Sequence, residues 1–421
     1  MGRLLLSINA GSSSVKVTVF KGSPGDTEPS DLAVVQIAGL TAPPATLSYE
    51  RGDVKIKNQE IEGVETQADA FKKILDHLIE DEGLGELKGK GDVEFACHRV
   101  VHGGDYDKQV RIDRDTYHHL EELSDLAPLH NAGALAIVKA VHDVLPSVTN
   151  IAFFDSTFHS TIPLATRTYM IDPDRATHNK LRKYGFHGLS YAYITRTISS
   201  YLSIPRDQTN IIALHLGSGA SACCIKGGKS IDTTMGLTPL SGLPGATRSG
   251  DVDPSLIFHF THDAGKPSRQ SSKDLHITEA EQILNKESGW KAITGTTDFG
   301  KISQGWEDGE EKAKLAFEIF ADRIVAYVGS YYVRLGGEVD ALVFAGGIGE
   351  KGAVLRKYVV EKLYCLGFEL DEGKNASPGK DRVVAIGKEG ARHKVLVCQT
   401  DEQTEMARQC VQSAADFKDK A

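Results

Sequence analysis

The fold follows from "LLLSINAGSSSVKVTVFKG" (residues 4–22) and its echo "IIALHLGSGASACCIKGG" (residues 211–228). Each stretch reads as an apolar strand, a short turn of glycine and serine, a second strand and a small turn. Gly11-Ser12 aligns with Gly217-Ser218 without a gap. Self-similarity of this kind indicates an internal duplication whose period is a whole domain. We therefore predict two related domains, each offering a polar turn; the alternative is a chance likeness between two hairpins.

Strand-like and helix-like segments alternate along the rest of the chain. Further strand-like runs are "VEFACHRVV", "NIAFFD", "DALVFAGG" and "HKVLVCQT". In helix-like segments such as "QADAFKKILDHLIED" and "EKAKLAFEIFADRIVAYVGSYYVRLG", apolar residues recur at intervals of three and four. This mixture over a long chain predicts α/β layers. The polar stretch 264–290 is interpreted as a loop followed by a surface helix.

The composition is that of an ordinary globular protein. Of 421 residues, 40% are hydrophobic and 25% are charged, and the formal net charge of −9 argues against a general nucleic-acid binder. The six cysteines show no metal-binding spacing, so free thiols in a reducing compartment are expected. No apolar run suits a signal peptide or a membrane helix. These features predict a cytoplasmic protein.

Two glycine-containing segments are candidates for binding phosphate. The turn Asn9–Ser14 is not a Walker loop, but its hydroxyls, its backbone N–H groups and Lys16 can contact phosphate oxygens. A plain hairpin turn is the alternative. "FAGGIGE" (344–350) follows a strand and is interpreted as a loop whose glycines let backbone approach a ligand.

Two arginines are candidates for binding an anionic substrate. In "HRVVHGGD" (98–105), Arg99 and Val101 share one face of a strand, and this pair suits a short carboxylate with an alkyl group. The alternative for Arg99 is a structural ion pair. Arg248 lies in the long Gly- and Pro-rich segment 233–254, where it can clamp a carboxylate or a phosphoryl group.

Other polar residues lie next to predicted strands and helices. Asp155 ends the strand "NIAFFD", a position that suits Mg²⁺ or a substrate as well as an Asx turn or helix cap. Asp401 or Glu402 can hold a metal, and Thr400 or Asp401 can cap the next helix. In "APLHNAG" (127–133), Leu129 precedes a helix for which Asn131 is a candidate cap.

His187 stands between an aromatic residue and a glycine in "KYGFHGLS". It can stabilise charge on a transferring group, although a surface or core histidine is the commoner case. The combination of two phosphate-type turns, a glycine loop, two arginines and two acids at strand ends is typical of phosphoryl transfer. That chemistry needs positioning, Mg²⁺ and cationic clamps more than covalent help from the protein.

Nine stretches, taken in order and with their spacing, resemble the acetate kinase family of the acetate and sugar kinase/heat-shock 70/actin superfamily. They are "NAGSSSVK", "HRVVHGG", "PLHN", "FDSTFH", "YGFHG", "HLGSG", "MGLTPLSGLPGATRSGDVDP", "GGIGE" and "TDE", and they span nearly the whole chain. The resemblance implies two duplicated ribonuclease H-like (actin-like ATPase) domains of α/β class with an interdomain cleft. It places the N-terminal domain at 1–154 plus a C-terminal helix at 403–421, and a nucleotide-binding domain at 155–402.

The resemblance also implies a reaction and a set of site residues. The reaction is Mg²⁺-dependent, direct in-line phosphoryl transfer between ATP and acetate by a homodimer. Acetate is expected at Arg99, Val101, Leu129, Phe186 and Pro239, with catalysis by Asn9, Asp155, His187 and Arg248. The metal is expected at Asn9, Asp155 and Glu402. Nucleotide and phosphate contacts are expected at Ser12, Ser14, Lys16, His215, Gly217, Ser218, Gly219, Asp298, Phe299, Gly346, Gly347, Ile348 and Gly349.

The chain departs from the family pattern at the nucleotide end. Ser218 and Ala220 replace Asn and Ser of the usual second phosphate turn, Gly300 replaces Arg in the usual D-F-R segment, and Lys351 stands where Asn is frequent. ATP/ADP is the expected phosphoryl partner, and phosphate/pyrophosphate is the alternative. A propionate or butyrate kinase and a non-catalytic nucleotide switch of the same superfamily are the competing functions.

Overall fold

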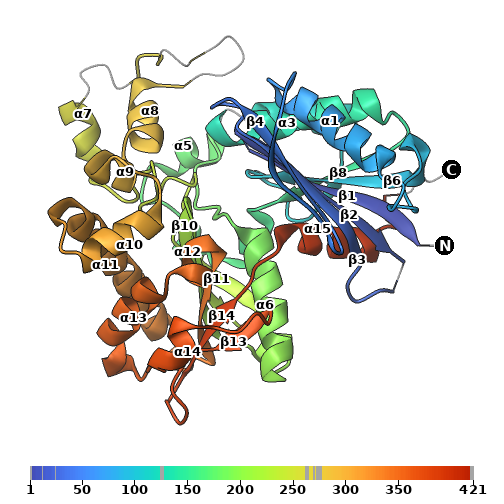
Figure 1. Cartoon of the computed structure of the whole chain (residues 1–421). Coiled ribbons are helices and arrows are strands. Elements are labelled where there is room, and N and C mark those ends of the chain that lie inside the picture. The colour runs from blue at the N-terminus through green and yellow to red at the C-terminus, as the bar shows by residue number, and fades with distance from the viewer. Residues whose placement is uncertain are drawn as a thin grey trace. The chain divides into compact units, whose positions relative to one another are not determined.

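The computed structural model consists of two compact units, Met1–Thr157 with Asp401–Ala421, and Phe158–Thr400. It describes residues 2–11, 13–23, 25–123, 128–260, 265–268, 271 and 277–417, without the side chains of 128–130, 132 and 260. Each unit contains one sheet with helices on its faces (Figure 1).

The first unit contains an eight-stranded sheet in the order β5-β4-β3-β2-β1-β6-β8-β7. Its strands are β1 (Arg3–Ala10), β2 (Ser14–Gly22), β3 (Ser30–Ala38), β4 (Ala45–Arg51), β5 (Val54–Ile61), β6 (Val93–Val100), β7 (Val110–Arg111) and β8 (Thr149–Phe154). Strands β1 to β5 form an antiparallel meander, while β6 pairs in parallel with β1 and β8 pairs in parallel with β6. The edge strand β7 is antiparallel to β8.

Strand β1 is buried on both faces of this sheet. Leu4, Leu6 and Ile8 join a core with α1 (Gln67–Glu80) and α3 (Pro128–Val144). On the opposite face, the Ser7 hydroxyl donates to the backbone carbonyl of Gln403 in α15 (Glu402–Gln412) at 2.9 Å. The helix from the end of the chain therefore covers the face that α1 and α3 leave open (Figure 1).

The second unit contains a six-stranded sheet in the order β11-β10-β9-β12-β14-β13. Its strands are β9 (Ile211–Leu216), β10 (Ala220–Lys226), β11 (Lys229–Thr233), β12 (Ala341–Ala345), β13 (Val383–Ala385) and β14 (Lys394–Cys398). Strand β9 is antiparallel to β10 and parallel to β12. Ile212 and Leu214 pack on the side of α11 (Glu311–Arg334) and α13 (Ala353–Lys362), whereas Ile211 and Ala213 pack on the side of α6 (Gly188–Leu202).

The remaining helices are short. In the first unit there is α2 (Arg114–Leu123). In the second unit there are α4 (Leu164–Arg167), α5 (Pro173–His178), α7 (Ile257–Phe260), α8 (Glu279–Lys286), α9 (Gly289–Thr294), α10 (Phe299–Glu307), α12 (Gly346–Lys351) and α14 (Glu372–Ala376). Capping residues fix several starts: Thr66 and Asp69 form a capping box for α1, and Asp401 caps α15 by accepting from the N–H groups of Gln403 and Thr404.

The predicted duplication is confirmed by the strand order. The run β3-β2-β1-β6-β8 and the run β11-β10-β9-β12-β14 both consist of a three-stranded antiparallel meander followed by two parallel strands. In both halves the chain then crosses to the other unit. The first long helix after β8 is α6, which belongs to the second unit, and the helix after β14 is α15, which belongs to the first.

Two local expectations were wrong. Asn131 does not cap α3, because Pro128, whose ring suits the first turn of a helix, already begins it. The segment 344–350 is not an open loop, because β12 runs to Ala345 and α12 starts at Gly346. The polar stretch 264–290 contains α8 and the start of α9, but residues 269–270 and 272–276 lie outside the described residues.

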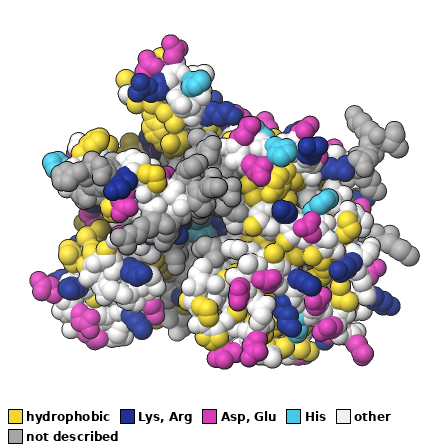
Figure 2. All heavy atoms as spheres, turned by 90° about the horizontal axis from the view of Figure 1, so that it is seen from above, with side chains coloured by type: hydrophobic (Ala, Val, Ile, Leu, Met, Phe, Trp, Pro, Cys, Tyr) yellow, Lys and Arg dark blue, Asp and Glu magenta, His cyan; other side chains and the backbone are white. Residues whose placement is uncertain are grey.

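Charged side chains of both signs are distributed over the surface, as the composition predicts (Figure 2). On the face drawn in Figure 2, acidic and basic side chains are interspersed. Within the described part of the chain, no helix is both long and apolar enough to cross a membrane.

Buried histidines predict how stability depends on pH. Burial lowers the pKa of His98, whose ring bonds the Asn150 side chain at 2.8 Å, to about 4, and it lowers the pKa of His159 to about 4 as well. Both values lie below the ~6.5 of an unfolded histidine. The unfolded chain therefore binds more protons between these values, and the free energy of unfolding falls as the pH drops from about 6.5 towards about 4.

Each histidine contributes roughly 3 kcal/mol to this loss when the window is crossed completely. Urea unfolding followed from pH ~7.5 to ~4.5 measures it, and His98→Gln or His159→Gln should flatten the slope. His178→Gln, at an exposed histidine of the second unit, is the control substitution. A native protein equally stable across this window contradicts the prediction.

Candidate functional site

The first polar turn joins β1 to β2 in the first unit. Asn9 lies opposite Lys16 in the antiparallel register, and the Gly11 N–H donates to the Ser14 carbonyl at 2.9 Å. The turn is therefore a hairpin turn, which was the alternative to a phosphate site. It also places Asn9 and Lys16 opposite each other on neighbouring strands. Ser12 lies outside the described residues.

Arg99 and Asp155 form a bidentate ion pair at the ends of β6 and β8. Nε and Nη2 of Arg99 donate to the two carboxylate oxygens of Asp155 at 3.0 and 2.7 Å. The Asp155 side chain is 1% exposed, whereas that of Arg99 is 17% exposed. The alternative interpretation of Arg99, an ion pair, is therefore realised. A guanidinium has five N–H donors, so this pair leaves three for another anion.

Glu402 adds a second carboxylate near the same arginine. Burial works against the charge of Arg99, but the carboxylates of Asp155 and Glu402 outweigh it and raise the pKa of the guanidinium. Glu402 is the first residue of α15, which reaches this place because the helix packs on β1, β2 and β6.

The donor set limits which metal this place can hold. Among the described residues, no group of three or more His, Cys, Asp and Glu side chains is arranged for a metal ion. Two carboxylates and the Asn9 amide offer only oxygen ligands of the hard kind. Such a sparse set fits Mg²⁺, which keeps several waters and binds proteins through one or two carboxylates together with substrate phosphates.

Hydrogen bonds from α3 hold the segment that follows β6 and contains Val101. Asn131 accepts from the His102 N–H at 2.9 Å and donates to the His102 carbonyl at 3.0 Å, so α3 fixes the segment that follows β6. Val101, which lies in that segment, is half-buried. Leu129 lies in the first turn of α3, and its side chain lies outside the described residues.

In the second unit, the turn between β9 and β10 is bound to the Gly- and Pro-rich segment 233–254. The Ala246 N–H donates to the Ser218 carbonyl at 2.8 Å. A Cβ placed on Gly219 would lie 2.9 Å from Nη1 of Arg248 and 3.9 Å from Nε2 of His187. Two nitrogen groups that can donate to an anion therefore converge beside Gly219, and a side chain at this position would displace the guanidinium.

Arg248 is a cation in a desolvated setting. Burial lowers the pKa of the Arg248 guanidinium. The pKa of Lys286 is lowered as well, mainly by burial and secondly by the positive charge of Arg248. Two cationic side chains thus lie near each other in this unit. Such an arrangement favours binding of an anion, whose charge offsets the mutual repulsion.

His187 is held in an unusual backbone conformation at the start of α6. Its φ is 58° and its ψ is 22°, a left-handed conformation that non-glycine residues rarely adopt. The preceding carbonyl, that of Phe186, is bonded by Nε2 of His159 at 2.9 Å, and Nδ1 of His159 bonds Ser230 at 2.8 Å. Strain at a residue whose surroundings fix it this firmly is frequent at functional sites.

The His187 ring is fixed as well. Its Nδ1 bonds Ser221 at 2.8 Å, and its ring stacks on His215 with centroids 4.2 Å apart. Nδ1 of His215 in turn bonds Ser190 at 2.7 Å. Both histidines predicted for the site are therefore brought together and oriented.

The third glycine segment belongs to the same neighbourhood of the second unit. Gly346 has a φ of +74°, and a Cβ there would lie 2.7 Å from the Leu216 carbonyl at the end of β9. The Glu350 carboxylate accepts from the Gly346 N–H at 3.1 Å and from the Thr400 N–H at 3.3 Å. Gly347 is exposed, Ile348 is half-buried and Gly349 is buried.

The segment expected to contact the nucleotide divides into an exposed part and a core part. Asp298 caps α10 by accepting from the Gly300 N–H at 2.9 Å, and both residues are exposed. Phe299 is 5% exposed and packs on Trp290 and Phe320 with ring centroids 5.2 and 5.1 Å apart. The Phe299 ring is thus a core side chain. Of the residues expected to contact the methyl group, Phe186 and Pro239 are both buried.

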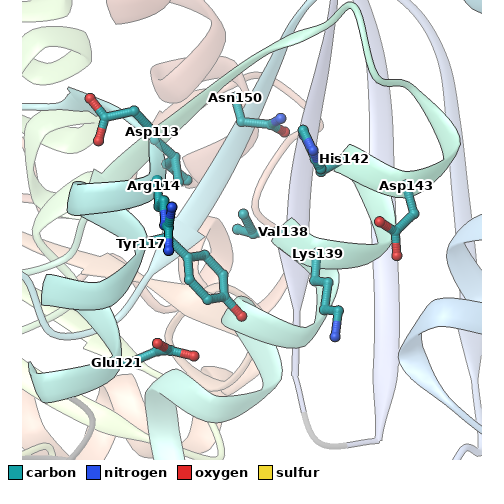
Figure 3. A pocket seen from close by; sticks show the side chains of 10 residues that line it. Asp113, Arg114, Tyr117, Glu121, Val138, Lys139, His142, Asp143 and Asn150 are labelled. Atoms are coloured by element: carbon teal, nitrogen blue, oxygen red, sulfur yellow. The ribbon is translucent and has the colours of Figure 1, made fainter.

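A groove of about 530 Å³ opens elsewhere, in the first unit between α2 and α3. Figure 3 shows Tyr117 and Glu121 on α2 and Val138 and Lys139 on α3 lining it. Its charged side chains have both signs, and it contains none of the predicted site residues.

The sequence reasoning missed several polar side chains that hold the predicted ones. They are His159, Ser190, Tyr191, Ser221, Ser230, Lys286, Glu350 and Thr400. Ser221 had a signal, because it is a polar residue inside an apolar strand. Glu350 and Thr400 also lie within quoted motifs, whereas Lys286 is distant in sequence and had no local signal.

Comparisons with known proteins agree on one family. The acetokinase family model matches residues 4–408. A probable acetate kinase of Emericella nidulans is 53% identical over 414 residues, which are 97% of each chain. A propionate kinase structure from Francisella tularensis has a TM-score of 0.84 at 33% identity, covering 97% of this chain and 98% of that one. An acetate kinase structure from Porphyromonas gingivalis has a TM-score of 0.79 at 31% identity, covering 96% and 98%. The chain therefore belongs to the acetokinase family.

Proposed function

We propose that this chain is an acetate kinase, which transfers a phosphoryl group reversibly between ATP and acetate to give acetyl phosphate and ADP. The observation that carries the proposal is the convergence of Arg248 and Nε2 of His187 beside Gly219 in the β9–β10 turn. Two donors at a glycine turn suit the equatorial oxygens of a phosphoryl group in transfer.

The chemical step is a direct in-line displacement. A carboxylate is ionised at neutral pH and needs no strong general base, so an acetate oxygen attacks the γ-phosphorus as it stands. The bond between the γ-phosphorus and the bridging oxygen breaks, and ADP leaves with that oxygen. Arg248 and His187 stabilise the charge on the three equatorial oxygens during this step.

We propose that the first unit binds acetate. Arg99 uses the donors that Asp155 does not occupy, and Val101, with Leu129, lies against the methyl group. Phe186 and Pro239 of the second unit are also assigned to the methyl pocket. The Arg99–Asp155 pair supports this role, because the buried carboxylate fixes the plane of the guanidinium.

Asn9, Asp155 and Glu402 are proposed to hold Mg²⁺. When bound, the ion neutralises charge on the phosphate oxygens. The Asp155 carboxylate also bonds Arg99. The Glu402 carboxylate and the Asn9 amide oxygen are the other two proposed ligands.

The second unit is proposed to bind the nucleotide. His215, Gly217, Ser218 and Gly219 line the phosphate end, with Gly346, Gly347, Ile348 and Gly349 beside it. Ser12, Ser14 and Lys16 of the first unit are assigned to the transferring phosphoryl. Asp298 and Gly300 are exposed at the start of α10 and mark the far end of the nucleotide site, whereas Phe299 contributes through its backbone because its ring is in the core.

The chain is further proposed to act as a homodimer in the cytoplasm. Exposed apolar side chains support a homodimer: Leu164 is 69% exposed and Val333 is 77% exposed. Arg334 bonds Thr166 at 3.4 Å, which joins α4 to the end of α11 and brings these side chains to one surface. Six free cysteines suit a reducing compartment.

A hydroxamate assay for acetyl phosphate tests the function directly. It should be run with acetate and ATP, and with pyrophosphate in place of ATP, and the reverse reaction should be run with acetyl phosphate and ADP or phosphate. Product with ATP supports the proposal, product with pyrophosphate alone assigns a different phosphoryl donor, and no product with either refutes a kinase. Propionate is included because one methylene changes kcat/KM by only about 10- to 200-fold.

Removing the Arg248 guanidinium should lower kcat by a larger factor than it raises KM. We expect Arg248→Ala to reduce kcat at least about 100-fold, equivalent to about 3 kcal/mol, with a smaller rise in KM for acetate, because charge on the phosphoryl oxygens is largest in the transition state. Steady-state kinetics measure both constants. Arg323→Ala, at an exposed arginine of the same unit, is the control. Near-native turnover in a folded Arg248→Ala variant removes this residue from the mechanism.

Restoring the family's arginine should strengthen nucleotide binding. Gly300 is exposed in the first turn of α10, and a Cβ there meets only the flexible Asp298 carboxylate at 3.1 Å. We expect Gly300→Arg to lower KM for ATP by about fivefold without changing KM for acetate, since a guanidinium adds charge and a stacking surface. Gly300→Ala, which restricts the backbone equally but adds no cation, is the control. Equal effects of the two variants contradict the prediction.

A further inference from the structure

A chain of buried hydroxyl groups ends on the ring of His187. The Tyr191 hydroxyl bonds the Ser221 hydroxyl, and Ser221 bonds Nδ1 of His187 at 2.8 Å. Tyr191 and Ser221 are both 0% exposed. Tyr191 lies on α6, one turn beyond His187, and Ser221 lies on β10, so two elements fix the ring together.

We propose that Ser221, oriented by Tyr191, fixes His187 as the neutral imidazole with Nδ1 accepting and Nε2–H donating towards the transferring phosphoryl group. Ser221 and Tyr191 are then positioning residues that act through His187. The assignment of the imidazole tautomer follows from the hydrogen bonds alone, and only its use on a phosphoryl group rests on the proposed function.

The donor directions follow from counting protons along the chain. The Tyr191 side chain is fully buried, and its hydroxyl bonds the Ser221 hydroxyl. A buried O–H needs an acceptor, so Tyr191 donates its proton to the Ser221 oxygen. Ser221 has one proton, which then goes to Nδ1 of His187. A nitrogen that accepts carries no proton, so the proton of a neutral ring is on Nε2.

Burial keeps this order in place. It raises the pKa of the Tyr191 phenol well above its ordinary value, so the hydroxyl remains a donor. A doubly protonated His187 would direct Nδ1–H at the Ser221 oxygen, and the Ser221 proton would then lose the acceptor that Nδ1 provides. It would also add a positive charge next to Arg248. The neutral ring satisfies every donor in the chain.

The Nε2 end of the His187 ring is where the proposed reaction needs a hydrogen-bond donor. Nε2 of His187 and Nη1 of Arg248 lie 3.9 and 2.9 Å from the place that a Cβ of Gly219 would occupy. An Nε2–H directed there can donate to an anionic oxygen, whereas the lone pair of the other tautomer would repel it.

The neighbouring histidine is held in a similar way. Nδ1 of His215 bonds the Ser190 hydroxyl at 2.7 Å, and Ser190 bonds the Thr400 hydroxyl at 2.7 Å. Ser190 and Tyr191 are adjacent on α6, so one turn of this helix anchors both rings of the stacked pair. Both stacked histidine rings are thus held at Nδ1 by a serine hydroxyl, which argues that the bond between Ser221 and His187 is not a chance contact.

The tautomer is measured by ¹⁵N NMR of the full-length protein with ¹⁵N-labelled histidine, the His187 signals being assigned with His187→Gln. The expected result at neutral pH is a pyridine-type Nδ1 and a pyrrole-type Nε2–H. In Ser221→Ala this preference should weaken, and the Nδ1 signal should move towards that of a ring exchanging between tautomers. A native His187 with its proton on Nδ1, or one unchanged by Ser221→Ala, overturns the proposal. This readout needs no turnover, so it separates failure of the relay from failure of the proposed function.

Kinetics supply the second test. Ser221→Ala should lower kcat about tenfold, as expected for losing one hydrogen bond that orients a donor, with KM for acetate and ATP nearly unchanged. Tyr191→Phe should lower kcat by less, because Ser221 can still donate to Nδ1 of His187 although Tyr191 no longer orients its hydroxyl. Tyr332→Phe removes a different tyrosine hydroxyl, bonded to His393 at 3.3 Å in the same unit, and should leave kcat unchanged.

A double variant distinguishes action through His187 from a general structural effect. If Ser221 acts through the ring, then adding Ser221→Ala to His187→Gln should lower kcat no further. Multiplicative losses in the double variant overturn the proposal, and so does an equal fall in kcat with Tyr332→Phe. If Tyr191→Phe does not fold, Ser221→Ala and the double variant still decide the question.

Discussion

Two strands that are buried on both faces, β1 and β9, impose the main constraint on this chain. Strands of this kind need a layer of helix on each side of their sheet. In the first unit α1 and α3 supply one layer, and α15 must return from the end of the sequence to supply the other. Asp401 and Glu402 reach the first unit as a consequence, because they begin the helix that β1 requires.

The glycines of the second unit follow from crowding at the ends of the strands. Because β12 runs parallel to β9, the start of α12 meets the end of β9, and Gly346 has no room for a side chain against the Leu216 carbonyl. The constraint at Gly219 is weaker, because a Cβ there would meet the flexible end of the Arg248 side chain rather than backbone. Glycine at position 346 permits the close approach, and the ends of parallel strands are where α/β folds bind ligands.

Strands were predictable from the sequence because apolar runs of four to eight residues carry a strong local signal. Contacts between distant segments were not, since nothing local to Ser7 indicates that it will bond Gln403. Arg99 shows the limit for single residues, because whether its guanidinium meets substrate or Asp155 depends on a partner 56 positions away. Phe299 shows the same limit for a motif, because its ring packs in the core rather than outwards.

Polar residues inside apolar strands mark buried networks, but they do not by themselves mark function. Ser7 in β1 and Ser221 in β10 interrupt equally apolar runs and are both fully buried. Ser7 donates to the backbone carbonyl of Gln403, so its hydrogen bond helps to pack α15 on β1. Ser221 bonds one nitrogen of a ring whose other nitrogen points at a glycine turn and a cation. Following each bond to its far end therefore separates a structural hydroxyl from one that can influence chemistry.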